Sequence, residues 1–595
     1  MATASAQQMV KKAMQLHHRG ELQQARELYA KVLELAPLHP DGLHLYGLVC
    51  HQLGDHKTAI SYIRRAIEQV PDQPVLRNNL GDAMRQAGKY EDALTQLHIA
   101  LDLRPNYAGA HQNLGSVYAD MGDHDAALKH ARKAVRLDAN RAEAWFNLGL
   151  VLLDHILLAD SADAFRKALV IRPVYPLAAT SLLYVLNLLP EMEPAAIEQE
   201  TCKVATALFK PVQSMPVSSH QSERIRIAYV SGDFCAHAVN YFFEPVLEFH
   251  DKTRFEIYCY SDVAQPDQIT RRLQQEASHW RDISTWDDDK VFEKVKSDKI
   301  DILVDLAGYT EHHRLGVFAR KPAVCQLSWL GFPNTTGLGA MDYRVVDQYT
   351  TPKDDTSMGS EELLRLPDGF ACFRPPEHAP PVQTAPVVSN GFVTLGCLHK
   401  LEKLNDDVIT LWARVLQENP DARLMLARDQ LDDWQQQRIR STFLQHGIGS
   451  DRLFMIQFSD SKQSFFDLFA DIDILLDTSP WSGHTLACCA LWMGVPVVSL
   501  YGDRHAGRMV ASVLNLLGFD ELIAKSAEAY ARIVNGLCRN QDKLIHYRAE
   551  LRERFKASPL RDEKGFTKSL ETEYRRIVSL KTKGRILVSS NRPFF

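Results

Sequence analysis

Three short stretches of the chain join a predicted strand end to side chains that bind phosphate. In one of them, the tetrapeptide Ser482–Thr485 follows the apolar segment Ile474–Leu476 and precedes an apolar, helix-like run. The first N–H groups of a helix are unpaired, and the helix dipole favours an anion beside them. Gly483 allows close approach of the backbone, and His484 and Thr485 add hydrogen-bond donors. This stretch predicts an anion site at the start of a helix.

Two further stretches place basic side chains directly after a predicted strand. Gly396–Asp407 (GCLHKLEKLNDD) offers Lys400 and Lys403. Val230–Phe243 (VSGDFCAHAVNYFF) offers His237. Ammonium groups neutralise phosphate, and histidine transfers protons near neutral pH. Each stretch alone is a weak signal, because a histidine after a strand is more often structural, but the three together favour phosphate and nucleotide chemistry.

Other catalytic patterns are absent or incomplete. No G-x-G-x-x-G follows a predicted strand, and Gly502–Arg508 (GDRHAGR) lacks the Lys-Ser/Thr ending of a P-loop. The acidic triplets Asp287–Asp289 and Asp471–Asp473 have the form of a metal-binding D-x-D pair, but we interpret them as a helix start and a strand entry. No Ser-His-Asp or Cys-His constellation follows from spacing. The sequence therefore predicts no metal and no other cofactor.

After Arg224 the chain alternates short apolar segments with amphipathic ones, the pattern of parallel sheets covered by helices. The Pro-rich segment Glu377–Gly391 is interpreted as a linker between two such α/β units. Two units in tandem are expected to bind a ligand between them, at the carboxyl ends of their strands. The predicted strands are Ile225–Val230, Phe255–Tyr260, Ile300–Asp305, Val324–Trp329, Tyr343–Val346, Phe392–Cys397, Arg423–Ala427, Leu453–Phe458, Asp473–Leu476 and Pro496–Leu500.

The first third of the chain repeats every 34 residues. This period is typical of the tetratricopeptide repeat, a pair of helices that buries its apolar face only by stacking on its neighbours. We expect five units between residues 6 and 175, the fifth degenerate with Ile156 at the glycine position, and a capping segment to about Pro190. The positions in register are Gly20, Gly54, Gly88 and Gly122; Ala25, Ala59, Ala93 and Ala127; and Pro37, Pro71 and Pro105.

Asn79, Asn113 and Asn147 keep the same register, each directly before Leu-Gly. Asparagine is a mediocre helix former, so its recurrence in the first helix of successive units needs a reason. Carboxamides along the concave face of a solenoid can hydrogen-bond an extended peptide backbone whatever its sequence. We therefore predict a ladder that binds acceptor peptides. The alternative is that asparagine is simply common at this position of the repeat.

Composition excludes several classes of protein. The 595 residues exceed a single core, and 45% of them are hydrophobic and 24% charged, as in globular domains. The net charge of -6 gives no electrostatic basis for binding nucleic acid or an acidic membrane. No stretch is long and apolar enough to span a bilayer, the start MATASAQQMVKK has no apolar leader, and the ten cysteines form no C-x-x-C pair. We expect a cytoplasmic protein with free thiols.

Four segments together resemble one family, the protein O-linked N-acetylglucosaminyltransferases and the plant SPINDLY proteins. They are IRIAYVSGDFCAHAVNYFF, DILVDLAGYTEHHRLGVFARKPAVCQLSWLGFPNTTGLGAMDY, LHKLEKLNDDVITLWARVL and DTSPWSGHTLACCALWMGVPVVSL. The resemblance covers nearly the whole chain and implies an α plus α/β fold, a tetratricopeptide solenoid followed by a GT-B glycosyltransferase of two Rossmann-like domains. The implied limits are 1–190 for the solenoid, 191–221 for a helical connector, 222–376 and 392–560 for the two Rossmann-like domains, 377–391 for their linker, and 561–595 for a C-terminal helix and tail.

The resemblance also implies roles for single residues. His237 matches the family's active-site histidine, close to the sugar and the acceptor, and Lys403 matches the lysine that neutralises the leaving diphosphate. Lys400 stands where relatives have a glutamine that touches the nucleotide. The stretch that holds the nucleobase corresponds to Asp460, Ser461, Lys462 and Phe465, and the cap on the diphosphate corresponds to His484, Thr485 and Leu486.

Two positions depart from the family's pattern. Leu486 replaces a threonine and removes one hydroxyl donor. Cys489 stands where the family has Asp or Glu, which accepts hydrogen bonds from the ribose hydroxyls. A thiol is a weak acceptor, so this change predicts a loss of roughly 1–3 kcal/mol of nucleotide binding unless another group substitutes.

The function implied by the resemblance is inverting, metal-independent transfer of N-acetylglucosamine from UDP-GlcNAc to Ser/Thr hydroxyls of proteins recruited by the repeats. Lys403 and the helix start at His484 would stabilise charge on the leaving phosphate. His237, or the donor phosphate itself, would take the hydroxyl proton.

Three further residues and two other functions complete the interpretation. Asp305 and Tyr309, at the end of a predicted strand, are candidate helpers, and Arg508 is either a phosphate partner or an ordinary surface residue. The segments WLGFPNTTGLGAMDYRVVD and LLRLPDGFACF resemble SPINDLY at least as closely as animal transferases, which leaves open transfer of fucose from GDP-fucose. The other alternative is a scaffold whose site has decayed at Cys489 and Leu486. Neither nucleic acid nor a membrane is expected as a partner.

Overall fold

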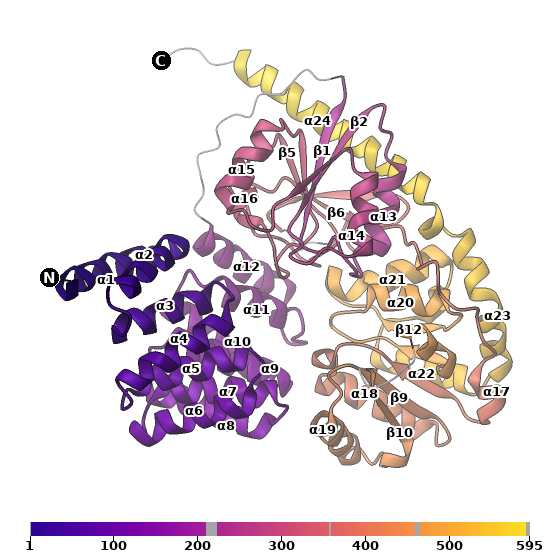
Figure 1. Ribbon diagram of the computed structural model, residues 1–595. Helices are drawn as coiled ribbons and strands as arrows, with labels where there is room; N and C mark the ends of the chain where they lie inside the picture. The colour runs from indigo at the N-terminus through magenta and orange to yellow at the C-terminus, as the bar shows by residue number, and fades with distance from the viewer. Residues whose placement is uncertain (1, 210–222, 356–358, 459–463, 591–595) are drawn as a thin grey trace. The chain divides into compact units, whose positions relative to one another are not determined.

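The computed structural model describes residues 2–209, 223–355, 359–458 and 464–590. The chain divides into two compact units, Met1–Pro173 and Val174–Phe595 (Figure 1). In the described part of the first unit, each helix packs on its neighbour in sequence and each pair stacks on the next, which confirms the predicted solenoid. Its helices are α1 Ala2–His18, α2 Leu22–Leu35, α3 Pro40–Gln52, α4 His56–Gln69, α5 Pro74–Gln86, α6 Tyr90–Leu103, α7 Ala108–Asp120, α8 His124–Leu137, α9 Ala142–Asp154 and α10 Leu158–Ile171.

The turn inside each pair explains the glycine register. Gly20, Gly54, Gly88 and Gly122 all have φ between 71° and 83°, a backbone conformation that glycine adopts without steric cost. The fifth pair keeps this turn with Ile156 at a φ of 59°, which is strained for a β-branched residue. The surrounding helices therefore impose the turn where the sequence no longer favours it.

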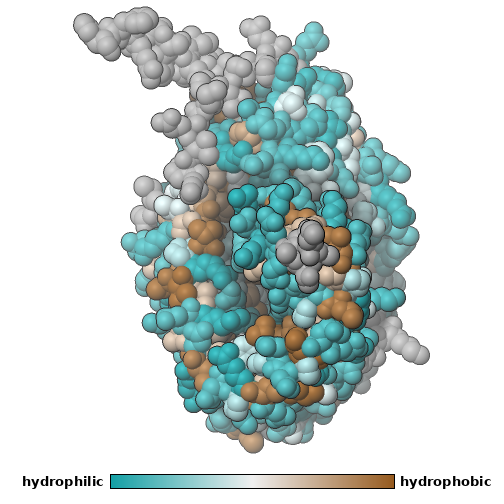
Figure 2. All heavy atoms as spheres, turned by 60° about the vertical axis from the view of Figure 1, so that its left-hand side comes forward, coloured by the Kyte–Doolittle hydropathy of each residue, from teal (hydrophilic) through white to brown (hydrophobic). Residues whose placement is uncertain are grey.

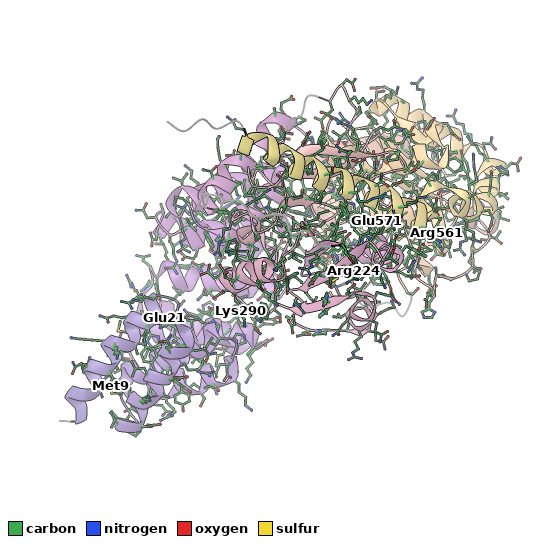
Figure 3. All side chains as sticks on the ribbon, turned by 90° about the horizontal axis from the view of Figure 1, so that it is seen from above. Met9, Glu21, Arg224, Lys290, Arg561 and Glu571 are labelled. Atoms are coloured by element: carbon green, nitrogen blue, oxygen red, sulfur yellow. The ribbon has the colours of Figure 1, made fainter. Side chains whose placement is uncertain are left out.

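The surface of the molecule is mostly hydrophilic on the face shown in Figure 2, where apolar residues form small separate groups. Large apolar side chains that stay exposed on the solenoid include Leu35, Leu38, Leu103, Leu157 and Val170. At the end of the solenoid where the chain begins, Met9 lies on α1 and Glu21 in the turn that follows it (Figure 3). Singly exposed apolar residues of this kind are normal on a protein surface.

The second unit begins with two helices, α11 Pro176–Leu186 and α12 Pro194–Leu208, and continues into a parallel sheet with strand order β3-β2-β1-β4-β5-β6-β7. The strand order reverses direction between β1 and β4. Helices α13 and α14 lie on one side of this sheet, and α15 and α16 on the other (Figure 1). The strands are β1 Ile225–Ser231, β2 Phe255–Ser261, β3 His279–Asp282, β4 Ile302–Asp305, β5 Cys325–Ser328, β6 Tyr343–Asp347 and β7 Glu362–Leu366; the helices are α13 Asn240–Phe249, α14 Gln268–Glu276, α15 Asp288–Ser297 and α16 Leu315–Phe318.

A second parallel sheet follows, with strand order β10-β9-β8-β11-β12-β13 and its reversal between β8 and β11. The two doubly wound sheets confirm the predicted fold class, and we propose 222–376 and 392–560 as the limits of the two domains. The strands are β8 Thr394–Cys397, β9 Arg423–Arg428, β10 Leu453–Gln457, β11 Ile474–Leu476, β12 Val497–Leu500 and β13 Ile523–Ala524; the helices are α17 Pro386–Asn390, α18 Asp406–Glu418, α19 Asp433–Gln445, α20 His484–Trp492, α21 His505–Leu517, α22 Ala527–Cys538 and α23 Gln541–Ala557.

The ten strands predicted from the sequence are present, with ends that differ by at most two residues. Three strands were missed, and all lie at the sheet edges: β3, β7 and β13. The edge strand β3 carries the polar sequence His-Trp-Arg-Asp and β13 has two residues, so neither gives the continuous apolar run of a central strand.

The last helix, α24 Glu563–Ser590, returns from the second sheet to the first and packs on α13, β5 and β7 (Figure 1). Glu571 on this helix accepts hydrogen bonds from the His250 ring, at 2.9 Å, and from the backbone N–H of Asp251, at 2.8 Å. Figure 3 labels Glu571 among the densely packed side chains along α24, and Arg561 just before the helix. The C-terminal helix is thus part of the first domain's core.

Candidate functional site

The reversal points of the two sheets locate the predicted site residues. Loops that follow neighbouring strands diverge where the strand order reverses, and a crevice opens there at the carboxyl edge of a parallel sheet. The reversal between β8 and β11 places Lys403 after β8 and His484 after β11. The reversal between β1 and β4 places His237 after β1 and Asp305 at the end of β4. The sequence predicted the two strand ends of each pair, but not that they are adjacent.

Asp477 holds the turn that leads from β11 to α20. Its Oδ1 accepts the backbone N–H of Gly483 at 2.8 Å, and its Oδ2 accepts the hydroxyl of Ser499 at 2.6 Å. Burial raises the pKa of Asp477 to about 6, although these hydrogen bonds and Lys403 favour the ionised form. Glycine is required at position 483, since a Cβ there would lie 2.3 Å from Cε1 of the buried His399 ring.

His484 is the first residue of α20, and its ring is packed between two aromatic rings of the first domain. The centroids of Phe242 and Phe370 lie 4.8 Å and 4.7 Å from the His484 centroid. Burial among these groups lowers the pKa of His484 to about 3, so the imidazole is neutral at physiological pH. A neutral ring at a helix start retains one N–H donor for an anion.

Lys403 is held against the same turn. Its Nζ donates to the carbonyl oxygen of Ser482 at 3.2 Å and lies 4.9 Å from the centre of the Trp481 ring. Burial lowers the pKa of Lys403 to about 8, a shift that the nearby Asp477 opposes. The ammonium therefore keeps its charge at neutral pH while it is largely shielded from water, and a desolvated charge interacts strongly with an anion.

Lys400 lies at the rim of this cluster and is exposed. Its Nζ is 5.5 Å from the centre of the Tyr184 ring, which in turn contacts Trp481 at 5.5 Å between centroids. The aromatic rings around Lys400, Lys403 and His484 were not predicted from the sequence. They belong to Phe242, Phe370, Trp481 and Tyr184, which are distant in sequence and follow no common spacing. Only Trp481, inside the stretch Asp477–Arg508, could have been noticed.

His237 lies in the loop between β1 and α13, with its side chain half exposed. Its Nδ1 accepts the backbone N–H of Val239 at 3.3 Å and is 3.7 Å from Oδ2 of Asp233. Phe242, on the helix that follows this loop, stacks on His484. The helix after His237 therefore packs directly against the start of α20.

The remaining predicted donor contacts have different surroundings. Phe465 is half buried and meets Phe466 and Phe469 edge to face, at 5.6 Å and 5.5 Å. Thr485 and Leu486 lie in the first turn of α20 and are partly exposed. Asp460, Ser461 and Lys462 lie outside the described residues.

Cys489 is buried in the second turn of α20, only 1% exposed. Burial raises the pKa of its thiol well above the usual value, so the sulfur is uncharged. Burial raises the pKa of the nearby Tyr241 phenol as well, and Cys489 contributes to that shift. Position 489, where the resemblance implied an acid, thus carries an uncharged and buried side chain.

The candidate helpers Asp305 and Tyr309, and the candidate phosphate partner Arg508, are engaged in internal hydrogen bonds. Asp305, 1% exposed, accepts the N–H groups of Ala307 and Gly308, and burial raises its pKa to about 7. Tyr309 donates its hydroxyl to the carbonyl of Thr336 at 2.8 Å. Arg508 forms an ion pair with Asp355 and also donates to the carbonyls of Gly502, at 2.8 Å, and Asp503, at 2.7 Å. Each holds local structure, whatever further role it has.

The three asparagines of the predicted ladder hydrogen-bond to side chains of the repeat before them. The Nδ2 of Asn113 donates to Oδ1 of Asn78 at 3.0 Å, and Asn147 donates to the hydroxyl of Ser116 at 3.2 Å. Asn79 lies 2.9 Å from the His44 ring. Asn113 is only 8% exposed, whereas Asn79 and Asn147 are half buried. These partners between repeats were not predicted.

The acidic triplets cap and brace their elements. Asp287 caps α15, and Asp288 and Asp289 pair with Arg314 and Arg320. Asp473 accepts N–H groups from Thr394 and Val387. Across the described residues, no three His, Cys, Asp or Glu side chains are grouped so as to hold a metal ion. Within the same ranges, no helix has the length and apolar character needed to cross a membrane.

Comparison with known proteins matches residues 173–374 and 388–570 to a family model described as Glycosyl transferase family 41. Tetratricopeptide-repeat models match residues 5–72, 81–122 and 113–176. A solved structure of a variant O-GlcNAc transferase from Thermobaculum terrenum is 34% identical, with a TM-score of 0.76, and the match covers 86% of this chain and 98% of that one.

Among curated proteins, the chain is similar to two plant proteins named "Probable UDP-N-acetylglucosamine--peptide N-acetylglucosaminyltransferase SPINDLY". It is 36% identical over 373 residues to that of Petunia hybrida and 37% identical over 367 residues to that of Arabidopsis thaliana. These matches cover 62% and 61% of this chain and 40% of each relative. The chain thus spans less than half the length of these relatives.

Proposed function

The chain belongs to glycosyltransferase family 41, and from this premise we propose that it transfers N-acetylglucosamine from UDP-GlcNAc to serine and threonine hydroxyls of proteins. The single observation that carries the proposal is the pairing of Lys403 with the start of α20 through the carbonyl of Ser482. A charged, desolvated lysine next to free helix N–H groups is suited to a diphosphate leaving group.

The proposed reaction is a single displacement. The acceptor hydroxyl attacks the anomeric carbon, the bond from that carbon to the diphosphate oxygen breaks, and the sugar is transferred with inversion. Negative charge grows on the leaving phosphate, where Lys403 and the N–H groups of His484 and Thr485 would stabilise it. His237 or a phosphate oxygen of the donor takes the hydroxyl proton.

The donor is held, in this proposal, by residues on both sides of the α20 start. Lys400, Thr485, Leu486 and Phe465 would contact the nucleotide, together with Asp460, Ser461 and Lys462 of the nucleobase stretch. Cationic side chains take the place of a metal ion. Cys489 offers the ribose no charged acceptor, so we expect weaker nucleotide affinity than a carboxylate at this position would give.

The solenoid would recruit the acceptor protein. Asn79 and Asn147 are only half buried, so a peptide backbone would reach them more readily than it would reach Asn113. Asn113 is deeper and would contribute by holding Asn78 in place.

Thermal shift and isothermal titration with UDP-GlcNAc, UDP and GDP-fucose test the choice of donor. We expect stabilisation by UDP-GlcNAc and UDP and none by GDP-fucose, with transfer of radiolabelled GlcNAc to protein. Binding of GDP-fucose alone would replace the proposed donor with a fucose donor. No binding of any of the three would mean that the site no longer holds a nucleotide sugar.

A further inference from the structure

One buried side chain, that of Asn240, holds the loop that carries His237, Gly232–Val239, at two points. Asn240, the first residue of α13, is only 5% exposed, and its Nδ2 donates to the carbonyl oxygens of Asp233, at 2.8 Å, and Cys235, at 2.5 Å. The backbone N–H of Asn240 also donates to the carbonyl of His237 at 3.1 Å. Asn240 therefore holds the loop before and at the histidine, alongside Ser231 and Asp267, whose side-chain oxygens accept the N–H groups of Asp233 and Ala236.

The amide of Asn240 acts only as a donor. Its Oδ1 is buried and has no hydrogen-bond partner among the described residues. A reversed amide would point Oδ1 at two carbonyl oxygens, so the orientation is determined by the loop. An unpaired buried oxygen costs roughly 1–3 kcal/mol, and the chain bears this cost to supply two N–H groups to the His237 loop.

Two groups compete for Nδ1 of His237. The backbone N–H of Val239 donates to it at 3.3 Å, whereas Oδ2 of Asp233 is 3.7 Å away, beyond hydrogen-bond distance. A ring nitrogen that accepts an N–H carries no proton, so in the neutral imidazole the proton is on Nε2. If Asp233 were the partner, Nδ1 would carry the proton and Nε2 would be free to act as a base.

We propose that Asn240 is a positioning residue that holds the His237 loop so that Nδ1 accepts the Val239 N–H and the neutral imidazole presents Nε2–H as a hydrogen-bond donor. The inference rests on the proposed function, because it takes His237 to face the donor and the acceptor. Its chemical consequence is that neutral His237 donates a hydrogen bond to a substrate oxygen. The proton of the acceptor hydroxyl then goes to a phosphate oxygen of the donor.

The test uses Asn240→Asp in the full chain. The variant keeps the shape of the side chain but directs a carboxylate at two carbonyl oxygens and removes both N–H donors. Labelling histidine with ¹⁵N reports which ring nitrogen is protonated, and His237→Gln identifies the His237 resonances. We expect an unprotonated Nδ1 and a protonated Nε2 in the parent, and resonances averaged between the two tautomers in Asn240→Asp.

Asn419→Asp is the matched control. Asn419 is also a buried asparagine, 8% exposed, that donates to a backbone carbonyl and to Asn535, but it lies at the end of α18 away from His237. We expect this variant to lower Tm and to keep the parent's His237 resonances and kcat. Asn240→Asp should lower kcat by about 100-fold, the effect of misplacing a reacting group, with donor KM changed by less than about two-fold.

Parent-like His237 resonances in a folded Asn240→Asp protein would overturn the inference, as would a parent spectrum with the proton on Nδ1. The kcat of His237→Gln separates a failure of this inference from a failure of the proposed function. If His237→Gln keeps the parent's kcat, His237 has no part in the reaction, while the resonances still decide what Asn240 does.

Discussion

The start of α20 and the asparagine positions of the solenoid both carry polar side chains that the sequence singles out, but their surroundings differ. At α20 the charged and titratable groups are desolvated, and burial moves the pKa of Lys403 to about 8 and that of His484 to about 3. In the solenoid, Asn79 and Asn147 are uncharged, half buried and bonded to neighbouring repeats. Desolvated charge suits stabilisation of a developing anion, whereas a row of neutral amides suits weak binding to any peptide backbone. Substitutions in the first region should therefore change rate, and those in the second should change acceptor affinity.

The largest expected effect comes from Lys403→Ala. The substitution removes the charge that the leaving phosphate requires in the transition state, so kcat should fall at least about 100-fold, while Tm changes little. Lys400→Ala, which removes an exposed lysine from the same segment, is the comparison variant and should have a smaller effect. Parent-like kcat in Lys403→Ala would remove this residue from the mechanism. Steady-state kinetics with a protein acceptor makes the measurement.

The pH dependence tests the same desolvated charge without a substitution. Burial lowers the pKa of Lys403 to about 8, so in the free enzyme the ammonium is present below that pH and lost above it. We expect kcat/KM for the donor to fall about ten-fold per pH unit above pH 8, since only the charged form stabilises the leaving group. Lys403→Arg, which stays protonated, should extend the plateau to higher pH. A profile that is unchanged by this substitution would assign the descending limb to another group.

Cys489→Asp tests whether a carboxylate in the second turn of α20 strengthens nucleotide binding. A carboxylate can accept hydrogen bonds from the ribose, and a gain of about 1.4 kcal/mol would make UDP bind about ten-fold tighter. Because position 489 is 1% exposed, the new charge should also lower Tm. Cys488→Asp, at a neighbouring position that is 0% exposed, is the control and should lower Tm without strengthening UDP binding. Calorimetric titration of UDP compares the two. Equal or weaker UDP affinity in Cys489→Asp would show that the ribose is held elsewhere.

A smaller effect is expected in the solenoid. Replacing Asn79, Asn113 and Asn147 together by alanine should raise KM for a full-length protein acceptor about five-fold, which corresponds to roughly 1 kcal/mol of lost hydrogen bonding. Hydrolysis of the donor and transfer to a short peptide should stay at the parent rate. Asn140→Ala, at an exposed turn of the same unit, controls for loss of an amide outside the ladder. The ladder hypothesis is wrong if the triple variant glycosylates the full-length acceptor as well as the parent does.

No effect is expected from chelation. The acidic triplets are used in a helix cap, in ion pairs and in strand contacts, and cationic side chains serve the diphosphate in the proposed mechanism. Activity should therefore be the same before and after treatment with EDTA. Activity that is lost with EDTA and restored by Mn²⁺ or Mg²⁺ would require a metal in the reaction.

Several features of the fold were predictable because local patterns in the sequence determine them. The 34-residue register specifies helix pairs, since each unit exposes an apolar face that only a neighbour can cover. Nine of the ten strands that were found are central, and their short apolar runs reflect burial on both faces of a parallel sheet. The tenth, the edge strand β10, was found because its sequence Leu-Phe-Met-Ile is apolar as well. The helix start at His484 was also predictable, as Gly483 and the preceding turn lie within a few residues of it. Ile156 shows the limit of such patterns, because packing maintains its turn without the glycine.

The contacts that give the site its chemistry were not predictable in this way. Lys403 meets Ser482 across 79 residues of sequence, and Phe242 and Phe370 of the first Rossmann-like domain pack on His484. Arg508 is engaged with Asp355, and Cys489 is buried, facts that no spacing reveals. The sequence by itself determined which elements form and which side chains stand at their ends, because helix and strand periodicity depend on neighbouring residues. Only the tertiary structure decided which of those ends meet and how far water is excluded from them, because the pKa of a lysine or histidine depends on groups that the fold brings from distant parts of the chain.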